Sequence, residues 1–547
     1  MPEECRAIMA NGSPQRLQSN SFCNSSRLLR RALHAHETGD LANADRLYAA
    51  VLQKEPENFD ALHGLGQVHC QCRRFDMALV LIQRALTIDR RRADGFSSLG
   101  LVFYYLRRPN DALTSFDEGL RIEPANTELL NLRGVALLEL GRASEALESF
   151  EHTLAIDPDL VDALGNYGNA LIKLNRPAEA LDVYDRALTI VPANAELLTN
   201  RAIALRKLDR PHEALMSVSR ALVSKPDFAQ ARFVDSLVRL TLGDFRAGWR
   251  GYETRWLGRN LSSQRRNFLV PLWLGEGSLE GKTILLHAEQ GFGDTIQFVR
   301  YAPLVAERGA RVVLEVQREL VRLLSGMTGI DAVIGRGETL PPFDLHCPLI
   351  SLPLAFATEL PTIPAPIAHI NVADDDVRLW HELLPRRRPR VGIVWSGDRS
   401  HDNDVNRSIG LKTLAPLFDV TDVDFVSLQH QMRDEDRDIL RDFPNLFRVE
   451  RSFRDFADTA AVVSSLDLVI SVDSAVAHLA GTIGKDLFLL LPFGADFRWL
   501  RERQDSPWYP TAKLFRQPKF GDWQSVTEIV SEELRARFFP SARKLSA

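Results

Sequence analysis

Small and bulky apolar residues alternate along the first half of the chain with a constant period of 34 residues. One small residue recurs in a single register, at Ala44, Ala78, Ala112, Ala146, Ala180, Ala214 and Gly248. A bulky residue follows four positions after each, at Tyr48, Ile82, Phe116, Phe150, Tyr184, Val218 and Tyr252. A second small residue keeps the same period, at Gly66, Gly100, Gly134, Gly168 and Ala202. Residues four apart share one face of a helix. The pattern therefore predicts paired helices that approach closely at the small residues, with the bulky ones filling the space between neighbouring pairs.

Proline and turn residues punctuate this period. A proline ends successive units, because it cannot continue a helix, at Pro56, Pro124, Pro158, Pro192 and Pro226. The turn sequences Asn175-Arg176-Pro177 and Asp209-Arg210-Pro211 separate the two helices of a pair. We count six regular units and a degenerate seventh, GDFRAGWRGYETRW. Its Trp249 and Trp256 are expected to seal the end of the array against the next domain.

This 34-residue repeat resembles the tetratricopeptide repeat, and the match covers residues 25–260. Stacked helix pairs of this kind form an α solenoid whose concave groove commonly holds an extended peptide. We therefore expect a protein or peptide partner in the groove; the alternative is that the array serves only as a spacer or dimer platform. Residues 1–24, which precede the array, are expected to be a disordered leader.

After a linker over residues 261–281, the pattern changes to apolar strands that alternate with helices. Seven strands are predicted in the segments KTILLHA, RVVLEV, DAVIG, RVGIVWSG, DFVSLQ, DLVISVD and LFLLLPF. Such alternation predicts an α/β fold with parallel sheets covered by helices on both faces. The Pro/Arg run at 384–390 divides the region into two Rossmann-like halves, residues 282–385 and 386–547. Ligands are expected at the carboxyl ends of the strands.

The first predicted strand ends in a turn that carries two glycines and an aspartate, Gly291-Phe292-Gly293-Asp294. The glycines permit a tight turn into a helix, and Asp294 falls near the start of that helix. From spacing alone, Asp294 is equally well explained as a helix N-cap or as a catalytic carboxylate. The pattern GxGxxG, which would indicate phosphate binding, is absent.

A second group of residues follows the strand of the other half. Ser396 and Gly397 are small enough for a ligand to approach the backbone, and Arg407 in the following polar loop offers a fork of donors for phosphate oxygens. A solvated surface loop explains the same composition.

The third group, SVDSAVAHLAGTIG, is the most informative. A strand ends in Asp473-Ser474, and the helix that begins there has amino-terminal amides able to hold an anion. Ser474 and His478 are four residues apart and share one face of that helix. A structural helix with an ordinary N-cap and histidine is the alternative.

Composition narrows the classes of function. The formal net charge is −5 and we find no basic stripe with interleaved aromatic residues, so nucleic-acid binding is not indicated. No apolar run approaches the ~20 residues of a membrane span, and the first two dozen residues lack the apolar core of a secretory signal. The five cysteines are scattered without a CxxC pair, which favours neither a disulfide framework nor a zinc site. A cytoplasmic protein is expected.

Together, the three groups resemble the family-nine glycosyltransferases, whose best-known members are the ADP-heptose heptosyltransferases, over residues 282–545. This resemblance implies a GT-B-like fold, with the acceptor bound by the first half and a nucleotide-diphosphate sugar by the second. It implies Asp294 as the general base. Donor contacts are implied for Ser396, Gly397, Arg407, Asp473, Ser474, Ala475 and His478. Gly293, Phe493, Gly494 and Asp496 are candidates for the sugar pocket, although the aromatic residues near Asp496 are equally explained by packing.

Two residues depart from the family pattern. Ala475 stands where the family has glycine, and Arg407 where lysine is frequent. The implied reaction transfers the sugar with inversion and uses neither a metal nor a further cofactor. We interpret the acidic run Asp374-Asp375-Asp376 as the first turn of a helix.

Repeats ahead of a glycosyltransferase domain also resemble the domain order of O-linked N-acetylglucosaminyltransferases, which implies a protein acceptor. The alternative from another class is a non-catalytic scaffold, in which the repeats bind partners and the C-terminal region is degenerate.

Overall fold

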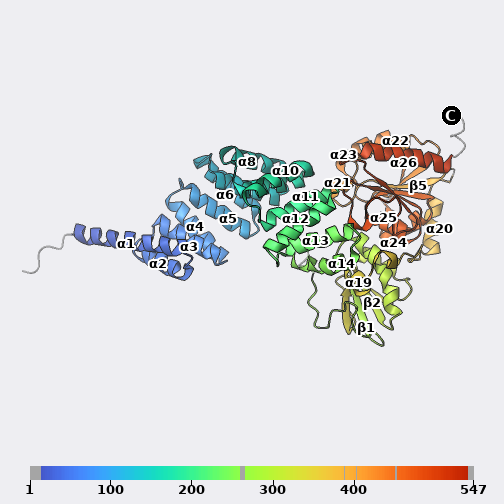
Figure 1. Cartoon of the computed structure of the whole chain (residues 1–547), viewed down its shortest axis with the longest axis horizontal. Helices are drawn as coiled ribbons and strands as arrows, with labels where there is room; N and C mark the ends of the chain where they lie inside the picture. Colours follow the sequence, from blue (N-terminus) through green and yellow to red (C-terminus); the bar gives the residue numbers. More distant parts are fainter. Residues whose placement is uncertain (1–13, 259–264, 387, 402, 450–451, 540–547) are drawn as a thin grey trace, which may run out of the picture. The chain divides into compact units, whose positions relative to one another are not determined.

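The computed structural model describes residues 14–258, 265–386, 388–401, 403–449 and 452–539. The chain divides into two compact units, Met1–Pro192 and Ala193–Ala547. Each unit is described separately below (Figure 1).

The first unit consists of helices joined by short turns, and consecutive helices pair as antiparallel hairpins (Figure 1). Its helices are α1 (Pro14–Glu37), α2 (Leu41–Lys54), α3 (Phe59–Gln71), α4 (Phe75–Ile88), α5 (Ala93–Tyr105), α6 (Pro109–Ile122), α7 (Thr127–Glu139), α8 (Ala143–Ile156), α9 (Val161–Lys173) and α10 (Pro177–Ile190). From α2 onward, these helices have the boundaries that the proline and turn signals predict. Helix α1 begins at Pro14, so residues 14–24 of the expected disordered leader are helical, and residues 1–13 lie outside the described ranges.

The bulky residues of the repeats pack against glycines of an adjacent helix. A Cβ atom on Gly100 of α5 would lie 2.3 Å from the ring of Phe116 in α6, its own hairpin partner. Gly134 of α7 and Phe150 of α8 repeat this contact at 2.4 Å. Tyr48 of α2 packs instead against Gly64 of α3 in the next hairpin, where an added Cβ would lie 2.4 Å from its ring. The expectation that the bulky side chains fill the space between neighbouring hairpins therefore holds for Tyr48 and is wrong for Phe116 and Phe150. A missing Cβ on one helix makes room for the aromatic ring on the other.

The hairpin turns share one backbone feature at the same 34-residue period. A residue with positive φ follows the first helix of each hairpin, at Gly39, Arg73, Arg107, Gly141, Asn175, Asp209 and Gly243. This left-handed conformation ends the first helix and redirects the chain into the second. Glycine and asparagine adopt it readily, whereas arginine does so at a cost in free energy.

The second unit begins with the last helices of the array. These are α11 (Ala195–Lys207), α12 (Pro211–Ser224), α13 (Ala229–Thr241), α14 (Phe245–Tyr252) and the 3-10 helix η1 (Glu253–Leu257). Trp249 is buried, and its ring centroid lies 5.9 Å from that of Phe298 and 5.6 Å from that of Phe497, both in the α/β region. The predicted sealing role of Trp249 is confirmed.

The first sheet has four parallel strands in the order β3-β2-β1-β4. They are β1 (Thr283–His287), β2 (Arg311–Val316), β3 (Ala332–Gly335) and β4 (Leu345–Pro348). The helices around this sheet are α16 (Phe292–Phe298), η2 (Val299–Tyr301), α17 (Ala302–Ala306), α18 (Arg318–Leu324), η3 (Leu349–Ser351), α19 (Leu352–Ala355) and η4 (Leu360–Thr362).

The second sheet has six parallel strands in the order β10-β9-β8-β5-β6-β7. They are β5 (Arg390–Val394), β6 (Asp424–Ser427), β7 (Leu446–Arg448), β8 (Leu468–Val472), β9 (Leu487–Leu491) and β10 (Ala512–Arg516). Its helices are α20 (Asp374–Leu383), α21 (Asp404–Arg407), η5 (Leu411–Leu414), α22 (Ala415–Phe418), α23 (Asp434–Ile439), η6 (Leu440–Asp442), α24 (Phe456–Ser464), α25 (Ala475–Thr482), η8 (Phe497–Trp499) and α26 (Trp523–Phe538). All seven predicted strands are present; β4, β7 and β10 were not predicted.

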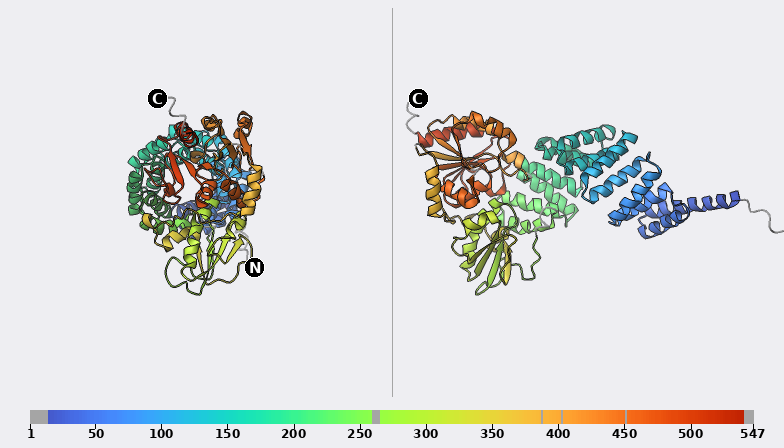
Figure 2. Two further views of the ribbon diagram at one scale, coloured as in Figure 1. Left: turned by 90° about the vertical axis from the view of Figure 1, so that its right-hand side faces the viewer. Right: turned by 180° about the vertical axis from the view of Figure 1, so that it is seen from behind.

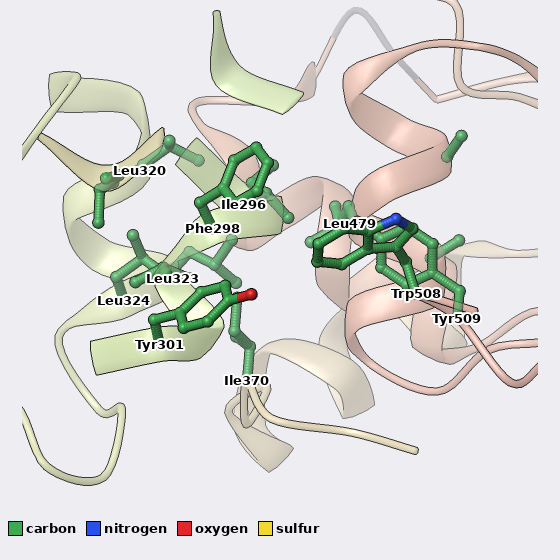
Figure 3. Packing of buried hydrophobic residues seen from close by; sticks show 14 of the residues in the cluster. Ile296, Phe298, Tyr301, Leu320, Leu323, Leu324, Ile370, Leu479, Trp508 and Tyr509 are labelled. Carbon is green, nitrogen blue, oxygen red and sulfur yellow. The ribbon is translucent and has the colours of Figure 1, made fainter. Parts of the chain in front are cut away.

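Helices cover both faces of the second sheet (Figure 2). Side chains of α22 and α26 pack with one face, and those of α24 and α25 pack with the other. The second of these cores is continuous with the core of the first sheet. Figure 3 shows Ile296 and Phe298 of α16 in the same buried cluster as Leu479 of α25 and Trp508. The C-terminal region is therefore α/β, with two parallel sheets whose helices share one core.

Candidate functional site

The candidate residues of the second half follow the carboxyl ends of adjacent strands. Ser396 and Gly397 follow β5, Asp473 and Ser474 follow β8, and Phe493 follows β9. Because β5, β8 and β9 are parallel neighbours, these ends meet at one edge of the sheet.

The two halves meet at this edge through α16 and α25. A Cβ atom on Gly293 would lie 2.7 Å from Cδ2 of His478 and 3.5 Å from Cα of Ala475. Any side chain at position 293 would therefore collide with the histidine ring. The structure thus brings the glycine turn of the first half against the amino end of α25, two places that are distant in the sequence.

Asp294 is held by two contacts. Its Oδ2 accepts a hydrogen bond of 3.1 Å from the amide of Gly291, and its Oδ1 forms an ion pair with Arg498. The first contact is the helix-capping role; the second connects the carboxylate to the other half of the region. The Asp294 side chain remains 21% exposed, so it is accessible from solvent.

Arg498 is the centre of a buried polar cluster that the sequence did not indicate. Its Nη1 donates to Oδ1 of Asp496 at 2.8 Å and its Nε donates to Oε1 of Gln297 at 2.7 Å. Although burial opposes ionisation, the Arg498 guanidinium lowers the pKa of Asp496 below its ordinary value. Arg498 therefore ties carboxylates from the two halves together.

His478 and Asp473 form the adjoining part of the site. The Nδ1 of His478 is 2.8 Å from the hydroxyl of Tyr509, its Nε2 is 3.7 Å from Oδ1 of Asp473, and its ring stacks on Trp499. Burial lowers the pKa of His478 well below its ordinary value, so the imidazole is neutral. Burial and the nearby Asp496 raise the pKa of Asp473.

The amino end of α25 has donors to spare. The Ser474 hydroxyl accepts from the amide of Ala477 at 3.4 Å and lies 3.0 Å from the Ser471 hydroxyl, so this side chain caps its own helix. The amides of Ala475 and Val476 have no acceptor among the residues that the structure describes. Such amides favour an anion.

Other polar atoms at this edge are buried and have no hydrogen-bond partner within the ranges that the structure describes. They are the hydroxyl of Ser396, Nε of Arg407 and Nε2 of Gln517, which follows β10. The Arg407 guanidinium lies against Gly397, where a Cβ would approach Nη2 within 2.6 Å. Because buried polar groups are nearly always hydrogen-bonded in proteins, these unpaired atoms at one edge are consistent with a bound ligand.

Gly494 and Phe493 have different surroundings. A Cβ on Gly494 would lie 2.4 Å from the carbonyl oxygen of Lys207 and 2.8 Å from that of Arg206, at the end of α11. The structure thus places Gly494 against a repeat helix. The amide of Phe493 donates to Oε1 of Gln517 at 3.1 Å.

A separate surface cavity of about 490 Å³ lies at the other end of the second sheet. It is lined by the first residues of β9 and β10 and by Glu533 and Arg537 of α26. Its charged side chains are paired, Lys513 with Glu533 and Arg537 with Asp486. None of the candidate site residues lines it.

Two searches of the described residues bear on metals and membranes. Within those ranges there is no group of three or more His, Cys, Asp or Glu side chains arranged to hold a metal ion. The acidic run Asp374-Asp375-Asp376 forms the first turn of α20, as predicted, and Asp376 pairs with Arg322 at 2.8 Å. No helix in this part of the chain combines the length and apolar character that crossing a bilayer requires.

Comparison with known proteins identifies the repeats. Two tetratricopeptide repeat models match the chain, one over residues 35–97 and 137–188 and the other over residues 98–161. The N-terminal half is a tetratricopeptide repeat array. Repeats of this kind indicate a role in protein interaction.

Among curated proteins, the chain is similar to Protein FlbA of Caulobacter vibrioides, with 25% identity over 337 residues. The match covers 57% of this chain and 56% of FlbA, so the chain spans little more than half the length of that relative.

Among solved structures, the chain is similar to a tetratricopeptide repeat protein from Parabacteroides merdae, with a TM-score of 0.38, 17% identity and coverage of 44% of this chain and 95% of that one. It is also similar to YrrB, described as a TPR protein with an unusual peptide-binding site, with a TM-score of 0.29, 19% identity and coverage of 34% and 95%.

Proposed function

We propose that the chain is an inverting glycosyltransferase that moves a sugar from a nucleotide-diphosphate donor to an acceptor recruited by the repeats. The proposal assigns the two parallel sheets to the halves of a GT-B-like, family-nine domain. The observation that carries it is the meeting of the Gly293 turn with the amino end of α25, beside the unpaired donors of Arg407 and Ser396.

The donor site is proposed at the edge formed by β5, β8 and β9. The free amides of Ala475 and Val476 and the Arg407 guanidinium are donors suited to phosphate oxygens. His478 is neutral, so it serves as a hydrogen-bond partner rather than as a positive charge. These donors stabilise the negative charge that develops on the leaving nucleotide.

Asp294 is proposed as the general base. As the acceptor oxygen bonds to the anomeric carbon, the bond from that carbon to the phosphate oxygen breaks and its electron pair leaves with the nucleotide. The proton of the acceptor hydroxyl passes to Asp294. The contacts with Gly291 and Arg498 orient this carboxylate, and each of its oxygens retains a lone pair for the acceptor hydroxyl.

The acceptor is proposed to be a protein. The repeats form half of the chain and indicate protein interaction. Helix α11 of the sixth repeat packs directly against Gly494 beside the proposed site, so a polypeptide held by the last repeats would arrive near it.

The competing proposal is a non-catalytic scaffold. One observation favours it: the Arg498 guanidinium pairs with both Asp294 and Asp496. Such an arrangement also serves to lock the two halves together without a substrate.

A nucleotide panel separates the two proposals. The full chain is heated with ADP, UDP, GDP or CMP, and melting is followed by tryptophan fluorescence. All eight tryptophans lie after residue 192, so the signal reports the second unit. A transferase is stabilised by at least one nucleotide, by about 2.7 kcal/mol at a hundredfold excess over Kd.

Turnover then tests the base. Release of nucleotide from the matching sugar donor is measured for the full chain and for two variants. Asp294→Asn retains nucleotide binding and loses activity, whereas Asp374→Asn, an exposed aspartate of α20, retains both. Absence of stabilisation by every nucleotide would leave the scaffold as the better description.

A further inference from the structure

The end of helix α11 is held by three loops of the second half. Gly494, after β9, lies against the carbonyl oxygens of Arg206 and Lys207. The Nζ of Lys207 donates to Oδ1 of Asn403, after β5, at 2.7 Å. Arg501, after η8, pairs with Asp209 at 2.8 Å. The sixth repeat therefore docks at the same edge of the sheet as the candidate donor site.

Arg206 differs from the corresponding residues of the other repeats. At steps of 34 residues, its register contains His36, Cys70, Tyr104, Leu138, Ile172, Arg206 and Leu240. An arginine occurs only in the repeat whose helix ends at the docking contact. The repeat pattern alone does not require a charge there.

The Arg206 guanidinium is unpaired within the part of the chain that the structure describes. Other arginines of the array pair with nearby acids, as Arg142 does with Glu145 and Arg176 with Glu179. The Arg206 side chain forms neither a hydrogen bond nor an ion pair with any residue that the structure describes. Burial lowers its pKa, and Asp496 is the charged group that opposes this effect most.

Asp496 links Arg206 to the candidate site. The same carboxylate pairs with Arg498 and raises the pKa of Asp473. The Arg206 backbone docks on Gly494, two residues before Asp496, so this repeat residue adjoins the polar cluster that contains Asp294 and His478. The five guanidinium donors of Arg206 are free of acceptors among the described residues, and its backbone docks on Gly494 at the edge that also carries Ser396 and Arg407, so an anion bound at this edge is a suitable partner for it.

We propose that Arg206 completes the donor site, as an anion-binding residue supplied by the sixth repeat for a phosphate group of the nucleotide donor. This inference rests on the proposed function. Its consequence is that donor binding requires the docked repeat helix. The repeats then take part in the chemistry of the site, in addition to recruiting a partner.

The test titrates UDP, ADP, GDP, CMP and inorganic pyrophosphate into the full chain by calorimetry. Arg206→Gln removes the charge, Arg206→Lys retains it without the planar fork, and Arg246→Gln makes the same charge change at an exposed residue of α14. We expect Arg206→Gln to weaken binding by about 10- to 100-fold, the range of a lost charge-assisted hydrogen bond. Arg206→Lys weakens it less, and Arg246→Gln leaves it unchanged.

Melting without ligand provides the check on folding. Because Arg206 is only partly buried and pairs with no described residue, Arg206→Gln is expected to melt close to the temperature of the unmodified chain. If Arg206→Gln fails to fold, Arg206→Lys carries the comparison.

The outcomes are distinguishable. Equal affinity of Arg206→Gln and the unmodified chain overturns the inference and leaves the proposed function intact. Weaker binding of nucleotides with unchanged binding of pyrophosphate overturns the assignment to phosphate. Binding of no nucleotide by the unmodified chain overturns both proposals.

Discussion

The contact of Gly494 with helix α11 offers a direct test of how the sixth repeat is held. An added Cβ would lie 2.4 Å from the carbonyl oxygen of Lys207 and 2.8 Å from that of Arg206. Both atoms belong to the backbone, so no side chain can rotate away. Gly494 does not have a positive φ, so Gly494→Ala tests the contact without adding backbone strain.

To admit the methyl group, α11 or the loop after β9 has to move by most of an ångström. Overpacking of this kind costs about 1–3 kcal/mol. The hydrogen bond of Lys207 to Asn403 and the ion pair of Arg501 with Asp209 weaken as the surfaces separate. With an unfolding entropy of roughly 2 cal/mol/K per residue, the second unit then melts about 1–4 °C lower.

Urea denaturation followed by tryptophan fluorescence measures this change, because every tryptophan lies in the second unit. The matched control is Gly326→Ala, at an exposed glycine whose added Cβ meets no atom within 4 Å. It is expected to change the free energy of unfolding by less than about 0.5 kcal/mol. If Gly494→Ala is as harmless as the control, the close docking of α11 is refuted.

Three further predictions concern the repeats and the buried charges. Arg107→Gly replaces an arginine in the left-handed conformation, at φ 60°, and is expected to stabilise the first unit by about 0.5–1 kcal/mol in urea denaturation followed by circular dichroism. Gly141→Arg, at the equivalent turn, is expected to destabilise it by a similar amount. Equal stabilities of the variants and the unmodified chain would contradict the backbone argument. Phe150→Ala leaves the space beside Gly134 empty and is expected to lower the free energy of unfolding by about 3–5 kcal/mol in the same assay. The control Met77→Ala, at a side chain that is 52% exposed, is expected to change that free energy little. A small effect of Phe150→Ala would mean that the hairpin contact is loose. Burial raises the pKa of Glu289 from 4.5 to about 7, so the folded chain loses stability as the pH rises from 4.5 to 7 and loses no more above pH 7. The variant Glu289→Gln therefore gains stability relative to the unmodified chain across that interval. A stability difference between the two chains in urea denaturation that stays constant with pH would refute the assignment.

The repeats were predictable because the information that specifies them is local. The register of Gly134 and Phe150 spans only 16 residues, and the turn at Asn175 is recorded in adjacent residues. Hairpin geometry follows from such short-range patterns. The direction in which Phe116 and Phe150 pack was nevertheless misjudged, because periodicity alone does not say which neighbouring helix a side chain meets.

The strands divide in a similar way. The seven predicted strands include every central strand of both sheets, whose two buried faces require apolar runs. The three that were not predicted, β4, β7 and β10, are edge strands of three to five residues. On their outer sides β4 and β10 form only an isolated bridge, Leu272 with His346 and Asp505 with Lys513, so a short and less apolar sequence suffices.

The candidate site depends on long-range contacts that local sequence patterns do not reveal. Asp294, Ser474 and His478 were recognisable because each follows a buried strand and begins a helix. The partner of Asp294 is Arg498, 204 residues further along the chain, and Arg501 pairs with Asp209 across 292 residues. Such contacts produce no periodic pattern in the sequence, so they cannot be predicted from it.

The amino-acid sequence was enough to establish the helical repeats, the central strands and the loops that carry polar residues, since each depends on neighbours within a few turns of chain. Folding in three dimensions placed the end of helix α11, with Arg206, against Gly494 and beside the polar cluster of Asp496 and His478. That placement arises from packing between segments hundreds of residues apart, where shape and burial determine which charges meet.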